Sequence, residues 1–271
     1  MIRTLAFCAL AATSPWLAAT TAAANPYDTK VQASVLTGWK TANGDHITAL
    51  KLQLEPGWKT YWRSPGDAGI PPEFDWRGST NLQGVALHWP TPHVFTQNGM
   101  RSVGYKREIV LPLTVRPQDR GQPVTLHGTL QIGICEEICV PVTLDISAML
   151  NGSATPKNPA ITAALRDQPM TARKAGVQNA TCRITPSANG LHIRAAVTMP
   201  ATGGPEHAVM ETADPQVWVS EPTTRRDGNT LWIEADLEHV SGQPFALERA
   251  GLRMTVLGTQ RAVDIQGCTA E

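Results

Sequence analysis

Short runs of alternating apolar and polar residues, separated by turn-forming residues, most constrain the fold of this chain. The clearest are Val124–Ile134 and Val140–Ile146. Alternation with a period of two places one set of side chains on a buried strand face and the other on an exposed face. The chain also carries 22 glycines and 21 prolines, and turn sequences such as Asn43-Gly44-Asp45 separate the runs. The pattern predicts an all-β architecture.

The alternating runs fall into two groups, separated by the linker-like segment Asn151–Pro156. Ala160–Lys174 is the only helix of useful length that the sequence predicts, and Pro169 limits it. We therefore expect a sandwich in residues 25–150, a linker and short helix in 151–175, and a second β-sandwich in 176–271. Strands of the second sandwich are expected at Ala180–Ile184, Leu191–Val197, Val217–Val219, Leu231–Leu237 and Leu252–Leu257.

Residues 1–24 have the features of a cleaved secretory signal peptide. Arg3 precedes an apolar stretch, and Ala22-Ala23-Ala24 forms a small-residue cleavage site before Asn25. The stretch is too short for a membrane anchor and is interrupted at residues 13–15. No later segment reaches the roughly 18 apolar residues that a membrane helix needs. We expect a mature protein in an exported compartment, with no membrane span.

The charge balance excludes several classes of partner. Without Arg3, 22 basic side chains remain beside 23 acidic ones, so the mature chain is nearly neutral. This balance does not favour nucleic acid or an anionic membrane surface as a partner. The sequence also shows no phosphate loop, hydrolase triad or paired catalytic carboxylates, and no histidine at metal-ligand spacing from a cysteine. No cofactor or metal is expected from these features of the sequence.

Four cysteines remain after signal removal, namely Cys135, Cys139, Cys182 and Cys268. An even number in an oxidising compartment indicates two disulfides, for which three pairings are possible. Pairing 135 with 139 and 182 with 268 gives each expected domain one bond. Cys182 lies on the apolar side of an expected opening strand, and Cys268 is close to the end of the chain. A bond between them would tie the first and last strands of the second domain, which we interpret as structural.

The other pair, Cys135 and Cys139, lies at the tip of a predicted hairpin. Strand parity places both on the polar face, opposite the core, and therefore predicts that both are accessible. Cross-strand neighbours are close enough for a disulfide. Closing this small ring stabilises the chain by roughly 2 kcal/mol, whereas the 182–268 ring contributes roughly 4.6 kcal/mol. A short, exposed ring is a weak staple that a thiol can attack easily, so we predict a redox function.

Glu136 and Glu137, between the two cysteines, indicate how the pair is tuned. Nearby carboxylates disfavour the thiolate, so we expect them to raise both thiol pKa values. A low-pKa thiol is a good leaving group and suits an oxidant, whereas a high-pKa pair suits a reductant. The two glutamates therefore favour a reductant.

Several uncommon sequence blocks occur in order along the first domain. They are Gly57–Gly69 (GWKTYWRSPGDAG), Pro72–Trp76 (PEFDW), Trp89-Pro90-x-Pro92, Gly104-Tyr105 and Gly133-x-Cys135-x-x-x-Cys139-x-Pro141. Through these blocks, residues 27–148 resemble the N-terminal periplasmic domain of the DsbD thiol:disulfide interchange proteins, in particular the ScsB-like branch. The second domain resembles the extra β domain of ScsB-type amino-terminal regions, without a sharp motif.

The resemblance implies an immunoglobulin-like, periplasmic domain that carries its redox pair on a hairpin. Such a domain takes electrons from a membrane-embedded or thioredoxin-like partner and passes them to oxidised periplasmic client proteins. By position, Cys139 corresponds to the cysteine that forms mixed disulfides, and Cys135 to the resolving thiol. This thiol:disulfide oxidoreductase activity, as a protein-disulfide reductase component, is the function that we expect.

The chain also departs from the DsbD pattern. The cysteine spacing in DsbD itself is wider, and its Phe-Tyr cap over the active site has no clear counterpart here. Phe95 is the nearest aromatic candidate for modulating the site. The membrane section and the carboxy-terminal thioredoxin-like domain are absent from the sequence, so we expect a separately encoded membrane reductase to supply the electrons.

Two other functions are compatible with the same cysteines, besides thiol:disulfide exchange. Cys-x-x-x-Cys followed by proline also occurs in Sco-type copper proteins, and soft thiolates suit Cu(I). That family has a thioredoxin-like βαβ frame and a distant histidine ligand, neither of which we identify here. The third possibility is a non-catalytic interaction module in which both disulfides are structural.

Five aromatic residues of the first domain are expected to serve packing rather than ligand binding, namely Trp58, Tyr61, Trp62, Trp76 and Trp89. Arg63 and Asp67 are expected to pair with each other within one loop.

Overall fold

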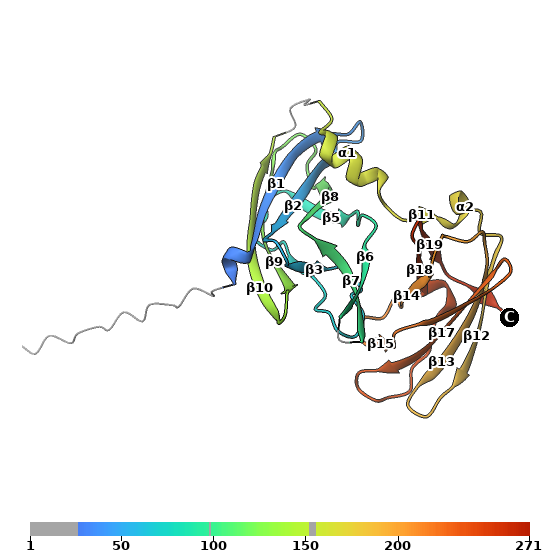
Figure 1. The fold of residues 1–271 in the computed structure, drawn as a ribbon. Coiled ribbons are helices and arrows are strands. Elements are labelled where there is room, and N and C mark those ends of the chain that lie inside the picture. The colour runs from blue at the N-terminus through green and yellow to red at the C-terminus, as the bar shows by residue number, and fades with distance from the viewer. Residues whose placement is uncertain (1–26, 98, 152–155) are drawn as a thin grey trace, which may run out of the picture.

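The computed structural model describes residues 27–97, 99–151 and 156–271, and shows two β-sandwiches side by side (Figure 1). The prediction of an all-β fold is therefore confirmed. The predicted signal peptide, and residues 152–155 of the predicted linker, lie outside the described residues. No helix in the described ranges is long and apolar enough to cross a membrane.

The first sandwich is immunoglobulin-like and consists of two sheets. One sheet has the order β1-β2-β8-β5 and the other has the order β10-β9-β3-β7-β6, with β4 also pairing with β9. The 3-10 helix η1 (Asp28–Lys30) precedes the first sheet, whose strands are β1 (Val31–Lys40), β2 (His46–Leu54), β5 (Leu82–Leu87) and β8 (Glu108–Pro117). The strands of the second sheet are β3 (Lys59–Tyr61), β4 (Glu73–Asp75), β6 (His93–Gln97), β7 (Met100–Lys106), β9 (Val124–Cys135) and β10 (Cys139–Leu150).

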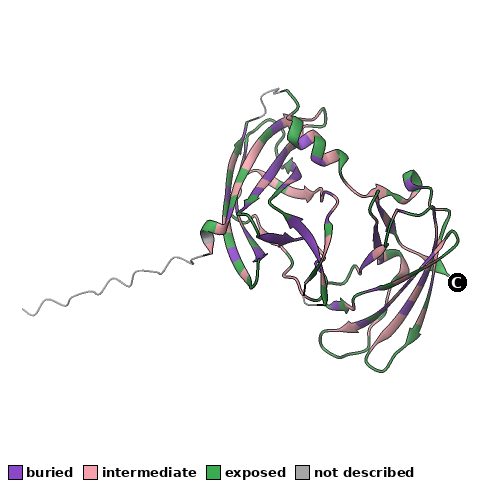
Figure 2. Ribbon diagram, in the orientation of Figure 1, coloured by how far each residue is buried: buried purple, intermediate pink, exposed green. Residues whose placement is uncertain are grey.

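Strand β9 shows why these residues form a sandwich. Its even-numbered apolar side chains, Leu126, Leu130, Ile132 and Ile134, are buried and belong to the core between the two sheets. On the opposite face, His127 and Gln131 are exposed, as the alternation predicts. Burying each large aliphatic side chain contributes about 1.5–3 kcal/mol, so register is strongly specified here. Figure 2 shows buried positions recurring along the strands of both sandwiches.

The second sandwich also has two sheets, with the orders β11-β19-β18-β14 and β15-β17-β13-β12-β20, and β16 pairs with β17. The first contains β11 (Met170–Thr171), β14 (His207–Glu211), β18 (Arg253–Leu257) and β19 (Ala262–Gln266). The second contains β12 (Asn179–Pro186), β13 (Leu191–Thr198), β15 (Val217–Val219), β16 (Thr223–Asp227), β17 (Thr230–His239) and β20 (Thr269–Ala270). All the predicted strands of this region are present, but β11, β14, β16, β19 and β20 were not predicted.

Between the sandwiches the predicted single helix is divided. Helix α1 (Pro159–Arg166) starts at Asn158, whose Oδ1 accepts a hydrogen bond from the Ala160 backbone N at 3.0 Å. It lies against β8, and its Ile161 side chain is fully buried. The first helix ends before Pro169, the residue expected to limit it. The chain then forms β11 and the short helix α2 (Ala172–Ala175), so the predicted range 160–174 is not one helix. A second 3-10 helix, η2 (Arg249–Gly251), precedes β18.

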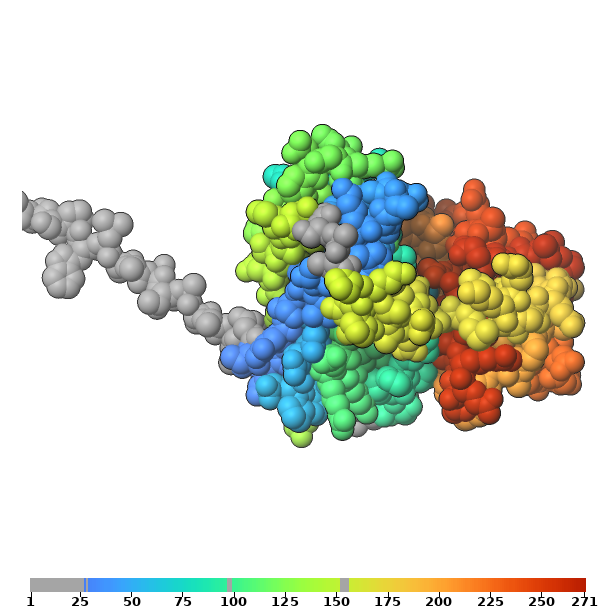
Figure 3. All heavy atoms as spheres, turned by 90° about the horizontal axis from the view of Figure 1, so that it is seen from above, coloured from blue at the N-terminus to red at the C-terminus, as the bar shows by residue number. Residues whose placement is uncertain are grey.

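The two sandwiches contact each other through apolar and charged residues. Val209, Leu257 and Ala262 of the second sandwich join the apolar core cluster of the first. Arg63 donates to both carboxylate oxygens of Glu211, at 2.9 and 2.8 Å. The predicted pairing of Arg63 with Asp67 was therefore wrong, because the arginine points towards the second sandwich instead. Figure 3 shows the segment around α1, in yellow, running from the first sandwich to the second.

Candidate redox site

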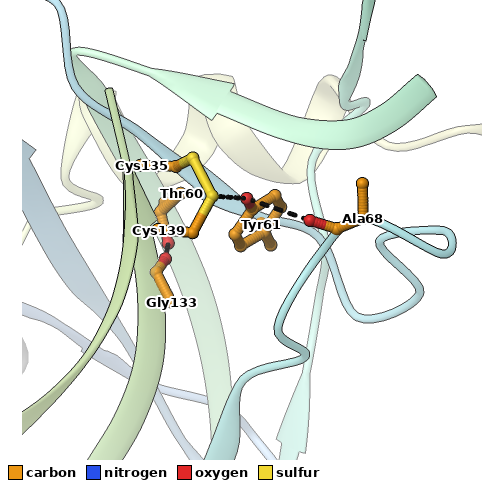
Figure 4. Close-up of a disulfide and its surroundings, with 6 residues drawn as sticks. All are labelled: Thr60, Tyr61, Ala68, Gly133, Cys135 and Cys139. Atoms are coloured by element: carbon orange, nitrogen blue, oxygen red, sulfur yellow. Dashed lines mark hydrogen bonds between the residues drawn. A yellow bond between two sulfur atoms is a disulfide. The ribbon is translucent and has the colours of Figure 1, made fainter. Parts of the chain in front are cut away.

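The Cys135–Cys139 disulfide closes the β9–β10 hairpin. The two residues are the last register partners of the strand pair, and their sulfurs are bonded (Figure 4). Between them, the backbone N of Glu136 donates to the carbonyl oxygen of Ile138 at 3.2 Å, so the tip is a tight turn. This places a small disulfide ring at the end of a long, well-paired hairpin.

The two sulfurs differ in access to solvent. Cys139 is exposed, whereas Cys135 is only 2 % exposed. Parity places Cys135 on the outward face of β9 as predicted, but the prediction that it is accessible was wrong. Beyond Gln131 the outward face is covered as well, because Gly133 and Cys135 are both buried. A thiol arriving from solvent therefore meets Cys139 first.

The outward face of β9 at Gly133 is covered by Tyr61 of β3 and by residues 64–71, which we call the cap loop. A Cβ added to Gly133 would lie 2.6 Å from the Cβ of Ile70 and 3.0 Å from the Tyr61 ring. A Cβ added to Gly69 of the cap loop would lie 2.9 Å from the same ring. Such distances are too short for a Cβ, so glycine at both positions lets the loop and ring close over the strand.

Tyr61 contacts the exposed sulfur directly. Its hydroxyl oxygen lies 3.1 Å from Cys139 Sγ and 3.4 Å from the carbonyl oxygen of Ala68 in the cap loop (Figure 4). A disulfide sulfur has no hydrogen to donate, so the tyrosine is the donor. Burial raises the pKa of Tyr61 above its usual value, which keeps the hydroxyl protonated near neutral pH. Thr60, on the other face of β3, donates to the carbonyl oxygen of Gly133 at 2.9 Å and fixes β3 against β9.

Lys59 lies opposite the buried sulfur. It is the register partner of Cys135 on β9 and of Lys106 on β7, and it is 7 % exposed. Its Nζ atom lies 5.5 Å from the centroid of the Phe95 ring, and Lys106 Nζ lies 4.8 Å from the same centroid. Burial, together with the positive charge of Lys106, lowers the pKa of Lys59.

A cavity of about 100 Å³ adjoins the disulfide and brings together residues from β3, β7, the cap loop and the hairpin. It is lined by Lys59, Tyr61, Ala68, Met100, Ser102, Cys135, Glu137 and Cys139. Two apolar side chains near its mouth face solvent, since Met100 is 57 % exposed and Ile138 at the hairpin tip is 54 % exposed. Exposed apolar side chains therefore lie near Cys139 beside charged ones, and they offer contact area for a protein partner.

The three predicted modulating residues occupy different places. Glu136 and Glu137 are exposed, and Glu137 lines the cavity with both cysteines. Glu136 leans towards Gly57, where an added Cβ would lie 2.4 Å from its Oε1 atom. Phe95 is not among the residues lining the cavity, and it contacts Lys59, which is.

Sequence reasoning assigned Tyr61 to packing and did not single out Lys59. A signal for both is present in the alternation of residues 58–62. Trp58 and Trp62 enter the core between the sheets, so Lys59 and Tyr61 must face outward, on the side of Cys135.

The second disulfide joins Cys182 to Cys268 in the other sandwich. Cys182 is 1 % exposed on β12, and β20, directly after Cys268, pairs with β12 in parallel. The bond therefore connects the opening strand of this sandwich to its carboxy-terminal end. Within the part of the chain that the structure describes, no three His, Cys, Asp or Glu side chains gather as a possible metal site.

Comparisons with known proteins agree with this geometry. Residues 29–151 match the family described as "Thiol:disulfide interchange protein DsbD, N-terminal". Among solved structures, the N-terminal periplasmic domain of ScsB from Proteus mirabilis is similar in fold, with a TM-score of 0.68 at 22 % sequence identity, covering 92 % of this chain and 97 % of that one. No curated protein sequence matches the chain. Residues 29–151 are thus a domain of the DsbD N-terminal type, within a chain that has the fold of the ScsB N-terminal region.

Proposed function

We propose that this protein is a periplasmic thiol:disulfide exchange component, which carries electrons through a reversible Cys135–Cys139 disulfide to oxidised client proteins. The observation that best supports the proposal is the unequal access to the two sulfurs. Cys139 is exposed at the hairpin tip, while Cys135 is 2 % exposed and lines a cavity together with Tyr61 and Ala68. Exchange requires that an attacking thiolate reach one sulfur and displace the other.

Reduction of the oxidised protein begins at Cys139. The thiolate of an electron donor attacks the Cys139 sulfur, a mixed disulfide forms, and the electron pair of the broken bond leaves on Cys135. Attack by a second donor thiol on this mixed disulfide releases Cys139, so that both thiols are free and the donor is oxidised to its own disulfide. The reaction moves two electrons and requires no cofactor.

Delivery to a client uses the same two residues in reverse. The Cys139 thiolate attacks the client disulfide, and Cys135 then attacks Cys139 of the mixed disulfide, which releases the reduced client and closes the ring. Cys139 is the catalytic nucleophile in this cycle, and Cys135 is the resolving thiol. The exposed Met100 and Ile138 provide apolar contact area for a docking protein beside Cys139.

The partners follow from the chemistry and from the family of residues 29–151. The electron donor is a membrane-embedded or thioredoxin-like reductase, and the acceptors are oxidised periplasmic proteins. Residues 1–24 are a signal peptide that directs export, and residues 176–271 are a second domain held together by the Cys182–Cys268 bond. Glu137 lines the cavity beside Cys139 and disfavours its thiolate, which suits a reductant.

Trapping of mixed disulfides tests the assignment of roles. Cys135→Ser leaves a nucleophile at Cys139 without a resolving thiol, so after exposure to an oxidised thioredoxin-like protein it should accumulate a stable mixed disulfide on Cys139. Non-reducing electrophoresis and peptide mass spectrometry detect and locate this product. The matched variant, Cys139→Ser, keeps only the buried thiol and should trap at least about tenfold less, because thiolate access limits exchange. Equal trapping by the two variants, or none by either, would contradict the assignment.

A further inference from the structure

A buried cation lies beside the sulfur that must leave during exchange. Lys59 is 7 % exposed, and its Nζ atom lies 5.5 Å from the centroid of the Phe95 ring. It faces Cys135 across the β3–β9 register, and both side chains line the same cavity of about 100 Å³. Directly opposed residues on paired strands have Cβ atoms about 4.5–5.5 Å apart, which is within reach of a flexible lysine side chain.

We propose that the Lys59 ammonium stabilises the Cys135 thiolate that is released when a partner's thiolate attacks Cys139. The proposal rests on the exchange function proposed above and assigns to it a residue that acts on the leaving group. Displacement places a full negative charge on a sulfur that is 2 % exposed, where water cannot solvate it well. A cation at this position offsets that cost and makes Cys135 a better leaving group, an effect on this thiol that is opposite in sign to that of the glutamates at the hairpin tip.

The charges balance at each step. The attacking thiolate brings one negative charge, the new sulfur–sulfur bond forms at Cys139, and the charge moves to Cys135 beside Lys59. When Cys135 later resolves a mixed disulfide, it attacks as the same thiolate and the charge leaves with the client's sulfur. Lys59 transfers no proton in either step, so the role proposed for it is electrostatic.

Other charged and titratable groups face the same space. Lys106, on β7 opposite Lys59, adds positive charge. Its side chain is exposed, so solvent and salt screen that charge. Glu137 at the hairpin tip opposes a thiolate but is also exposed. Tyr61 is protonated near neutral pH and donates towards Cys139, not towards Cys135. Phe95, on the far side of Lys59, positions the ammonium through a cation–π contact.

A single-thiol protein isolates the effect. In Cys139→Ser with the Cys182–Cys268 bond intact, the only free thiol of the mature chain is Cys135. The ultraviolet absorbance of its thiolate can be titrated without requiring access by a reagent. Adding Lys59→Met should raise the pKa of this thiol by about one unit or more, because an adjacent cation typically lowers a pKa by about 1–3 units.

Two further variants separate charge from packing. Lys59→Arg keeps the charge and should hold the thiol pKa close to that of the Cys139→Ser parent. Lys106→Met removes a screened, exposed charge from the same row and should change the pKa by less than a third as much as Lys59→Met. Circular dichroism verifies the fold of each protein, and Lys59→Gln replaces Lys59→Met if the latter does not fold.

An unchanged Cys135 pKa in a folded Lys59→Met or Lys59→Gln protein would overturn the inference, as would a rise of equal size in Lys59→Arg. This titration requires no exchange partner, so its outcome is independent of whether the wild-type disulfide cycles. With both cysteines present, Lys59→Met should also slow reduction of the Cys135–Cys139 bond by dithiothreitol at neutral pH several-fold. An unchanged rate would contradict the inference, whereas a disulfide that even the wild-type protein keeps until unfolding would contradict the proposed function.

Discussion

The Tyr61 hydroxyl has one hydrogen and two acceptors within reach, Cys139 Sγ and the Ala68 carbonyl oxygen of the cap loop. The hydroxyl lies between Cys139 Sγ and the Ala68 carbonyl oxygen, at 3.1 and 3.4 Å. Neutral sulfur is a weak acceptor, whereas a thiolate accepts a hydrogen bond strongly. The contact should therefore stabilise the reduced, ionised form of Cys139 more than the disulfide.

Tyr61→Phe tests this contact while keeping the ring that covers Gly133. The Cys139 thiolate loses a donor worth about 1 kcal/mol, after allowing for the competing Ala68 carbonyl. At neutral pH, alkylation of Cys139 in a Cys135→Ser background should become about fivefold slower, because the thiol pKa rises. Stopped-flow or mass-spectrometric alkylation rates measure the change.

Tyr105→Phe is the matched control for that variant. Its hydroxyl donates to the Pro90 carbonyl oxygen at 2.8 Å in the buried core. Removing it leaves a buried acceptor unsatisfied and should cost about 1–3 kcal/mol of stability without changing the alkylation rate. If Tyr61→Phe left the rate unchanged, or Tyr105→Phe slowed it equally, Tyr61 would have only a packing role.

At the scale of the elements, the hairpin illustrates what the sequence can and cannot predict. The alternation in β9 and β10 correctly predicts two strands, the tip between them and the buried face. The burial of Gly133 and Cys135 does not follow from that pattern. Tyr61 and Ile70 cover Gly133, Lys59 lies across from Cys135, and all three are distant in the sequence. A period-two pattern reports one buried face, and a loop that folds over the other face leaves no periodic signal.

Two other differences between prediction and structure are the missed strands β14 and β19 and the helix predicted over residues 160–174. Strands β14 and β19 are short and mostly buried, and therefore lack a clear alternation. Residues 160–174 carry good helix formers on both sides of Pro169, yet the chain turns into β11 there and pairs in parallel with β19. Local propensity suggested one helix, and sheet pairing with a remote strand decided otherwise. The family blocks were informative because they constrain tertiary contacts as well as local structure.

For the whole molecule, the contact between the sandwiches links the second one to the base of the cap loop. Arg63, directly before the cap loop, donates to both oxygens of Glu211, and its side chain is only 15 % exposed. On neighbouring β7, Arg101 forms an ion pair with Glu221 and donates to the Pro222 carbonyl oxygen at 2.9 Å. A bidentate, partly buried pair is more favourable than an exposed one.

A double-mutant cycle tests this linkage. Arg63→Met and Glu211→Gln, alone and together, should give a coupling free energy of about 1–2 kcal/mol in chemical unfolding. The more exposed pair Lys51–Glu108, within the first sandwich, should give less than about 1 kcal/mol in the same type of cycle. Coupling for Arg63–Glu211 no larger than that of the surface pair would show that the contact does not fasten the two sandwiches together.

The reduction potential of the Cys135–Cys139 pair tests the central claim most directly. The mature protein is equilibrated in dithiothreitol or glutathione redox buffers, free thiols are alkylated, and peptide mass spectrometry locates them. We expect a reversible transition confined to this pair, at or below about −200 mV, while Cys182–Cys268 stays oxidised. A Cys135–Cys139 bond that persists until the protein unfolds would identify it as a structural staple and contradict the proposed exchange function.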